Sequence, residues 1–308
     1  MEMSLLLMGQ IAKMFLMILM GFCIVKAGML KAKDSKVLSM TTLYLIMPCM
    51  IIDAFQVEFT PEKVQALMLS TLAAVIVHAV YITAAGLLKR PAKLSSVEST
   101  SMIYGNAGNL IVPIVSSLFG REYLLYTSGF MIVQTILLFT HCRASLGGRG
   151  SMSIGGIVKN VNIIAIAIGL VLFATGLRFP TMIGEAISSV GACVGPVSMI
   201  VTGMLLGGFS WNRIGEYRRL PMILLLRLIA FPMITLLIYK FSPLKTLAPD
   251  GEAILLISYL ASCAPTASSV TQLSQVYGGD SEYAGLINMT TTLLCIITMP
   301  LMVLLLQM

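Results

Sequence analysis

Long apolar runs alternate with short polar links along almost the whole chain. A helix that crosses the hydrocarbon core of a membrane needs about 20 predominantly apolar residues, and runs of this length recur throughout the sequence. The pattern therefore predicts an all-α, polytopic membrane protein with ten transmembrane helices. The expected spans are residues 4–25, 35–56, 64–88, 96–118, 123–142, 157–177, 183–209, 217–240, 252–275 and 283–306.

The fourth run carries residues that do not suit a helix in lipid. Residues 104–114 read YGNAGNLIVPI and include Gly105, Asn106, Gly108, Asn109 and Pro113. Glycine and proline weaken or break helices, and an asparagine side chain in hydrocarbon needs hydrogen-bond partners. Unwound peptide groups are tolerated at membrane depth only where protein, water or a ligand satisfies them. We therefore predict that helix 4 is broken beside a polar cavity near the middle of the membrane.

The ninth run carries a comparable interruption. It reads SYLASCAPTASSVTQLSQVYGG and contains Pro265 among hydroxyl side chains, of which Thr266, Ser268 and Ser269 are candidate site residues. Taken alone, each motif could instead be a packing glycine or a proline kink, both of which are common in membrane helices. Because the two motifs occupy corresponding runs, we interpret them together as one site.

The two halves of the chain correspond in more than these breaks. Five runs lie in residues 1–142 and five in residues 157–308, joined by a short link at 143–156. Helices 2 and 7 each carry a mid-span proline, Pro48 and Pro196. Since five is an odd number, homologous halves would be inverted in the membrane, and paired interrupted helices in inverted repeats point to the binding site of a secondary transporter. The predicted fold is thus two inverted five-helix repeats with broken, crossing helices 4 and 9.

Composition and charge support a membrane protein and give its orientation. The chain is 57% hydrophobic and 11% charged, whereas soluble domains carry about 25% charged residues. We expect a multi-pass protein of the plasma (cytoplasmic) membrane. Most lysines and arginines fall in links 1–2, 3–4, 5–6 and 7–8, so the positive-inside rule predicts that both termini lie outside. The six cysteines are scattered singly, which supports neither a disulfide framework nor a metal site, and no cofactor is expected.

Two cations lie within the predicted spans, Lys13 in helix 1 and Arg227 in helix 8. Each costs roughly 2.5–3.5 kcal/mol at a helix centre, so either the side chains extend to the membrane surface or they face the cavity. No acidic residue lies clearly at the midplane. The free N–H groups at the start of a broken half-helix favour an anion. Together these features predict a site for a small carboxylate, with Lys13 and Arg227 as candidate ligands.

Other amide side chains in the spans have a simpler interpretation. Gln134, Gln272, Gln275 and Asn288 are expected to form hydrogen bonds between helices. Asn106 is the first candidate for contact with a substrate, because it lies at the break itself.

The order and spacing of these motifs resemble a known family. Asn106 precedes Pro113 by seven residues, Pro265 precedes Tyr277 by twelve, and helix 6 begins with KNVNIIAIAIGLV at Lys159. In these features the chain resembles the auxin efflux carrier family, which contains plant auxin exporters and bacterial malate or malonate permeases. It is more distantly similar to bile-acid/sodium symporters and sodium/proton antiporters.

The resemblance implies an architecture. Helices 1, 2, 6 and 7 would form a scaffold that also makes a homodimer, and helices 3–5 and 8–10 a transport domain that moves like an elevator. The long cytoplasmic loop of the plant carriers is missing, because only residues 143–156 separate the halves. Gly105 and Val161 stand where the plant carriers have proline.

We therefore interpret the chain as a secondary transporter for a small organic anion in a lipid membrane, working by elevator-type alternating access. An auxin-like or indole-acid efflux carrier and a sodium-coupled symporter are alternatives within transport, and coupling to Na⁺ or H⁺ stays open. A membrane ligand sensor is the alternative outside transport. An enzyme is not expected, since no metal cluster, nucleophile elbow or phosphate loop occurs in the sequence, and nucleic acid is not an expected partner.

Overall fold

The computed structural model describes residues 2–111, 114, 115, 119, 123–147, 159–209 and 215–307. Within these ranges the regular elements are helices, accompanied by one isolated antiparallel bridge. The candidate residue Pro113 and most of the link at 143–156 lie outside the described residues.

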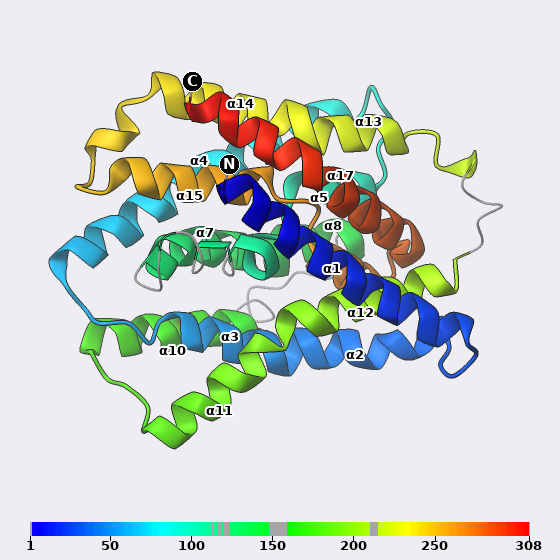
Figure 1. Cartoon of the computed structure of the whole chain (residues 1–308), viewed down its shortest axis with the longest axis horizontal. Coiled ribbons are helices and arrows are strands. Elements are labelled where there is room, and N and C mark those ends of the chain that lie inside the picture. The colour runs from blue at the N-terminus through cyan, green and yellow to red at the C-terminus, as the bar shows by residue number, and fades with distance from the viewer. Residues whose placement is uncertain are drawn as a thin grey trace.

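The first half of the chain forms a series of helices that is coloured from blue at α1 to blue-green at α8 in Figure 1. They are α1 (Glu2–Lys26), η1 (Ala32–Asp34), α2 (Ser35–Thr41), the π-turn η2 (Thr42–Ile46), α3 (Met47–Ala54), α4 (Pro61–Lys89), α5 (Ser96–Ile103), the π-turn η3 (Ala107–Ile111), α7 (Leu124–Leu137), the π-turn η5 (Leu138–Cys142) and α8 (Arg143–Gly147).

The second half continues with a similar series of helices. They are α10 (Val161–Thr175), α11 (Thr181–Ala192), α12 (Val194–Gly207), α13 (Leu220–Leu225), the π-turn η8 (Leu226–Ala230), α14 (Phe231–Phe241), η9 (Pro243–Thr246), α15 (Gly251–Cys263), α16 (Ser268–Tyr277) and α17 (Ser281–Gln307).

Six helices of the described chain are long and apolar enough to cross a membrane. They are Ala32–Ala54, Pro61–Lys89, Leu125–Gly147, Thr181–Gly207, Leu220–Phe241 and Ser281–Leu306. Each overlaps a span expected from the sequence, and Val161–Thr175 and Gly251–Cys263 are shorter apolar helices. The structure is therefore that of an all-helical membrane protein.

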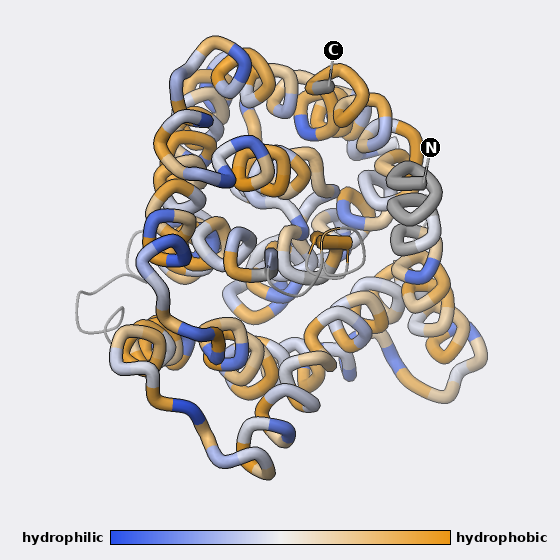
Figure 2. Tube along the Cα trace, turned by 60° about the vertical axis from the view of Figure 1, so that its left-hand side comes forward, coloured by the Kyte–Doolittle hydropathy of each residue, from blue (hydrophilic) through white to orange (hydrophobic). Residues whose placement is uncertain are grey.

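The distribution of side chains also suits lipid. Large apolar side chains such as Met20, Met68 and Leu87 are exposed, while serine, threonine, asparagine and glutamine side chains are buried. Figure 2 shows hydrophobic residues along most helices and hydrophilic residues in several links. In water so much exposed apolar surface would promote association, whereas in a bilayer it faces the hydrocarbon.

Helix ends follow local signals in the sequence. The Asn160 side chain caps α10 by accepting hydrogen bonds from the backbone N–H groups of Asn162 and Ile163, a common role for asparagine. Gly176 ends the same helix with a φ of 67°, a left-handed conformation that glycine adopts without a steric penalty.

Two prolines in mid-span are accommodated by π-turns. Pro48 and Pro232 each stand at the start of an α-helix, and a π-turn, η2 or η8, directly precedes that helix. Proline lacks an N–H and clashes with the preceding turn, and a wider turn absorbs this conflict. In helix 8 this matters for the site, because η8 contains Arg227.

The helix contacts describe two groups, which α17 connects through its contacts with α1 and α12. In the first, α1 packs against α12, and α3 packs against α10 and α11. In the second, α4 packs against α7 and α15, and α14 packs against α15 and α17. In Figure 1, α2, α3, α10 and α11 lie in the lower part of the molecule and α4, α13, α14 and α15 in the upper part.

Glycines bring α1 and α12 into close contact. A methyl group at Gly203 would overlap the Ile18 carbonyl, and one at Gly21 would overlap the Ile200 carbonyl. Small residues allow membrane helices to approach closely enough for extensive van der Waals contact, so this pair is held by backbone proximity.

We predict that Gly203→Ala destabilises the protein by about 1–3 kcal/mol, the usual cost of overpacking. Gly86→Ala is the matched control, because nothing lies within 4 Å of a methyl group at that α4 position. Thermal unfolding in detergent should show a lower midpoint for Gly203→Ala alone. Equal midpoints for the two variants would contradict the close contact between α1 and α12.

Candidate functional site

Helices α5 and α15 both end deep inside the molecule. After Ile103, the last residue of α5, Tyr104 has an extended backbone with φ −96° and ψ 120°. After Cys263, Ala264 has φ −60° and ψ 151°, and Ala267 is extended immediately before α16 begins. We call residues 104–106 and 264–267 the crossing.

The two extended segments of the crossing pair with each other. Gly105 and Thr266 form an antiparallel bridge. The Asn106 N–H donates to the Pro265 carbonyl at 2.7 Å, and the Ala267 N–H donates to the Tyr104 carbonyl at 2.9 Å. Each segment thereby satisfies backbone groups that the other exposes, as burial requires.

Two side-chain amides complete this arrangement from opposite sides. Gln134 of α7 donates from Nε2 to the Gly105 carbonyl at 2.8 Å, and Asn288 of α17 donates from Nδ2 to the Thr266 carbonyl at 2.7 Å. The expectation that these amides form interhelical hydrogen bonds is confirmed. The Thr266 N–H also donates to the Thr291 hydroxyl at 3.1 Å.

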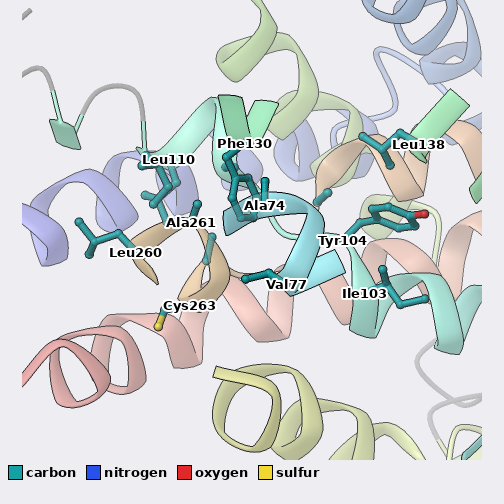
Figure 3. Close-up of a cluster of buried hydrophobic side chains, with 14 of the residues drawn as sticks. Ala74, Val77, Ile103, Tyr104, Leu110, Phe130, Leu138, Leu260, Ala261 and Cys263 are labelled. Carbon is teal, nitrogen blue, oxygen red and sulfur yellow. The ribbon is translucent and has the colours of Figure 1, made fainter. Parts of the chain in front are cut away.

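The surroundings of the crossing are tightly packed and apolar. Figure 3 shows Val77, Leu110, Phe130 and Leu260 around this region, and all four side chains are buried. Tyr104 is anchored by its hydroxyl, which lies 2.8 Å from His141 Nδ1. In such surroundings an unpaired backbone group is expensive, which explains why the crossing is so fully hydrogen-bonded.

Arg227 binds the ends of both broken helices. Its side chain is buried, and its Nε and Nη2 atoms donate to the Ala264 carbonyl at 3.1 and 2.7 Å. Its Nη1 atom donates to the carbonyls of Met102 and Ile103 at 3.1 and 3.4 Å. A cation is favourable at the C-terminus of a helix, where carbonyls lack partners and the dipole is negative. The Arg227 guanidinium thus donates hydrogen bonds to carbonyls at the C-terminal ends of both α5 and α15.

Gly105 is needed beside this guanidinium group. A methyl group at Gly105 would overlap Arg227 Nη2 and would also come within 3.1 Å of the Ala261 carbonyl. The glycine expected from the sequence to weaken the helix therefore also admits the arginine.

A small cavity lies next to the crossing. Its volume is about 30 Å³, and the second half of the broken helix 4 contributes Gly108 while α16 contributes Ser269. Met47, Met50 and Val194 line it from α3 and α12, and Gly105, Asn106, Gln134 and Thr135 are among the residues that line it from the other group. The cavity is therefore shared between the two groups of helices.

Two polar atoms of residues that line this cavity have no partner among the described residues. Asn106 Nδ2 and Gln134 Oε1 are buried without a hydrogen bond. Buried polar groups are almost always paired, so an unpaired donor and an unpaired acceptor suit water or a ligand. The cavity also lies at the start of η3 and α16, and the N-terminal end of a helix carries partial positive charge that attracts anions.

The candidate residues from the sequence fall into distinct places. Gly105, Asn106, Gly108 and Ser269 line the cavity, while Pro265 and Thr266 belong to the crossing. Ser268 is buried at the first position of α16, the side chain of Asn109 is not described, and Pro113 lies outside the described residues.

The two candidate cations do not line this cavity. Arg227 is directed to helix C-termini, and Lys13 is exposed on α1. Sequence patterns cannot separate these positions, because a cation near the midplane can face a cavity, a carbonyl cluster or the membrane surface. Conversely, the sequence interpretation missed Met47, Met50, Thr135 and Val194 as lining residues, which have no distinctive signal in their apolar surroundings.

A larger cavity of about 560 Å³ lies beside the start of α5. Its carboxylates are already bonded within the protein: Glu98 accepts from Arg219 at 3.1 Å, from the Ser95 N–H at 2.7 Å and from the Tyr283 hydroxyl at 3.3 Å. Asp280 likewise accepts from the Tyr217 hydroxyl at 3.2 Å. These bonds join the starts of α5, α13 and α17, so we interpret the cluster as structural. Across the described chain, no group of histidine, cysteine and acidic residues is arranged to hold a metal ion.

Comparison with known proteins gives one finding. A family model described as a membrane transport protein matches residues 6–151 and 149–303. A search of curated proteins finds no match.

We predict that Arg227→Met lowers stability, because the carbonyls of Met102, Ile103 and Ala264 lose their donor. A buried group left without a partner costs about 1–3 kcal/mol. Thermal unfolding in detergent should therefore show a clearly lower midpoint, and the exposed cation variant Lys13→Met should keep the parent midpoint. A stable Arg227→Met protein that binds anions more weakly would instead assign the guanidinium to the ligand.

Proposed function

The chain belongs to the auxin efflux carrier family of membrane transport proteins, and on this basis we propose that it carries a small organic anion of the carboxylate class across the membrane. The observation that carries this proposal is the cavity at the crossing, where two half-helices begin beside an unpaired donor and acceptor. Asn106, Gly108 and Ser269 would contact the anion, and Thr266 and Pro265 would hold the backbone that surrounds it.

The charge pattern around the cavity favours an anion. No acidic side chain is among the described residues that line it. The starts of η3 and α16 contribute positive dipole ends, equivalent to about half an elementary charge for a full helix and acting within the first turn. Asn106 Nδ2 adds a neutral donor. A carboxylate can accept several such hydrogen bonds at once, whereas a cation would meet the same groups with the wrong sign.

The size of the cavity argues for movement. Ligand pockets have volumes of about 300–1,000 Å³, and about 30 Å³ accommodates little more than water. Because α3 and α12 form one wall and the crossing forms the other, displacement of one group against the other would change the volume. We propose that α1–α3 and α10–α12 are the scaffold and that α4–α8 and α13–α17 are the transport domain of an elevator.

Helix contacts support two inverted repeats. The contact of α1 with α12 has a counterpart in that of α10 with α3, and the contact of α4 with α7 has one in that of α14 with α17. Gln134 and Asn288 are a matching pair in helices 5 and 10, each donating to one strand of the crossing. The two segments matched by the family model also meet within the link at 143–156. We infer that the halves are related by a two-fold axis through the crossing.

We further propose the orientation that the positive-inside rule predicts, with both termini outside the cytoplasmic membrane, and a homodimer formed by the scaffold. In this orientation α5 and α16 occupy the cytoplasmic half of the membrane. The segment after the crossing in helix 4 and α15 occupy the outer half.

We predict saturable uptake of a carboxylate into proteoliposomes that contain the purified protein. A panel of malate, malonate, other small carboxylates and indole-acetate identifies the substrate, and separate Na⁺ and pH gradients show whether either ion is coupled. Uptake that needs neither gradient would indicate a uniporter. Binding of a panel member without flux would contradict transport and favour a membrane sensor.

We predict that Asn106→Ala abolishes flux but leaves the unfolding midpoint close to that of the parent. The reason is that Nδ2 of Asn106 has no partner among the described residues, so its removal costs the folded protein little. Asn162→Ala is the contrasting control, because this amide donates to the Leu43 carbonyl at 2.8 Å and its loss should lower stability. Parent flux rates in Asn106→Ala would remove this residue from the site.

A further inference from the structure

Helix α16 is joined to the proposed scaffold by a row of side-chain hydrogen bonds. Gln275 accepts from the Ser39 hydroxyl at 2.6 Å and donates to the Ser35 hydroxyl at 2.8 Å. Gln272 donates to the Ser198 hydroxyl at 3.1 Å. We call this row the polar seam; it also includes the hydroxyls of Tyr44 and Tyr277, which lie 2.6 Å apart.

The polar seam runs from the interior to the surface. Along α16 the polar seam runs from Gln272, which is buried together with Ser198, to Gln275 and Tyr277, which are half-buried. Ser35 and Ser39 on α2 are also buried. The polar seam therefore closes the space between α16, α2 and α12 along the cytoplasmic half of the molecule. Other amides at this depth, such as those of Gln134 and Asn162, bond within one group of helices.

We propose that the polar seam is the cytoplasmic gate of the carrier and that Gln275 sets the register in which it closes. This inference rests on the proposed function, because it assumes that the transport domain moves against the scaffold. Gln275 is a positioning residue: it acts on the path to the crossing without touching the substrate.

The register argument comes from the sequence of helix 2. Ser35 and Ser39 are one helical turn apart, so they match both the donor and the acceptor of one amide. Towards the crossing the following positions are Leu43 and Met47, which are apolar and buried. If α16 moved toward the crossing by one turn, about 5.4 Å, the Gln275 amide would lie between Ser39 and Leu43. It would then keep a hydrogen bond to only one serine. Packed elements commonly shift between such discrete registers, and here only one register pairs the whole amide.

The variant Gln275→Leu should still fold, because the serine hydroxyls that Gln275 contacts can form other hydrogen bonds. Ser35 Oγ also donates to the Ala32 carbonyl at 2.6 Å, and a serine hydroxyl within a helix can bond to its own helix. Gln275→Leu therefore removes the seam contact without leaving the scaffold side unpaired. We expect it to weaken the closed state while preserving the fold.

The test reads access to the crossing from each side of the membrane. Met50 lines the cavity, so Met50→Cys serves as reporter after Cys23, Cys49 and Cys193, the cysteines that are not buried, are replaced by serine. A membrane-impermeant thiol reagent is applied to inside-out and to right-side-out vesicles. We expect Gln275→Leu to raise the labelling rate from the cytoplasmic side about fivefold or more, with no increase from the outside. Thr175→Val, which removes an exposed hydroxyl bonded within α10, should leave both rates within twofold of the parent.

A second variant keeps the test decisive if Gln275→Leu fails to fold, as judged by gel filtration in detergent. Ser35→Ala combined with Ser39→Ala removes the same bonds from the other side and should give the same one-sided increase. Unchanged cytoplasmic labelling in the folded variants, or an equal increase from both sides, would overturn the gate. If the variants show the one-sided increase in labelling rate but the parent protein transports no carboxylate, the proposed transport function would be wrong. The polar seam would still be a contact that controls access to the cavity from the cytoplasmic side.

Discussion

The need to satisfy backbone polar groups in a dry interior governs the centre of this protein. Helices α5 and α15 both end among buried residues, and a helix end leaves carbonyl and N–H groups that need partners from elsewhere. The structure answers with a short antiparallel pairing between Gly105 and Thr266, with two side-chain amides and with one buried guanidinium. The two amides and the guanidinium come from helices 5, 10 and 8, so the hydrogen bonding of the crossing is complete only where these helices pack against helices 4 and 9. The site is therefore formed by several helices together rather than by one motif, and α3 and α12 add residues to the wall of its cavity.

This dependence explains why the sequence predicted the interruptions better than it predicted their partners. Gly105, Asn106 and Pro265 predict interruptions in helices 4 and 9, because their backbone and side-chain properties conflict with a lipid-exposed helix. The apolar runs likewise predicted the spans, because hydrocarbon thickness sets helix length. The sequence marks Arg227 as a cation within a span, but it does not show which groups the guanidinium binds. Either an anionic ligand or backbone carbonyls can offset the cost of burying this charge. Met50 and Val194 approach the crossing only through tertiary packing, for which an apolar sequence carries no local signal.

The hydrogen bonds around the crossing are of two kinds, those within one group of helices and those between the two groups. Gln134, Asn288 and Arg227 bond to backbone carbonyls within one group of helices, and in the proposed elevator they would move with that group. Gln272 and Gln275 bond to serine hydroxyls of the other group. A hydroxyl can rotate to a new partner in its own helix, whereas a carbonyl at a helix end cannot. Hydrogen bonds from amides to helix-end carbonyls therefore suit contacts that stay formed. Hydrogen bonds between amides and hydroxyls suit contacts that break and form again.

Arg227 can influence an anion without touching it. Four helix ends meet at the crossing: the C-termini of α5 and α15, which carry partial negative charge, and the starts of η3 and α16, which carry partial positive charge. Left alone, these charges would largely cancel at the crossing. The guanidinium group binds the carbonyls of both C-termini, so it compensates the negative ends and leaves the positive ends directed toward the cavity. In the proposed carrier, this buried cation behind the backbone would favour an anion in a cavity whose described lining contains no basic side chain.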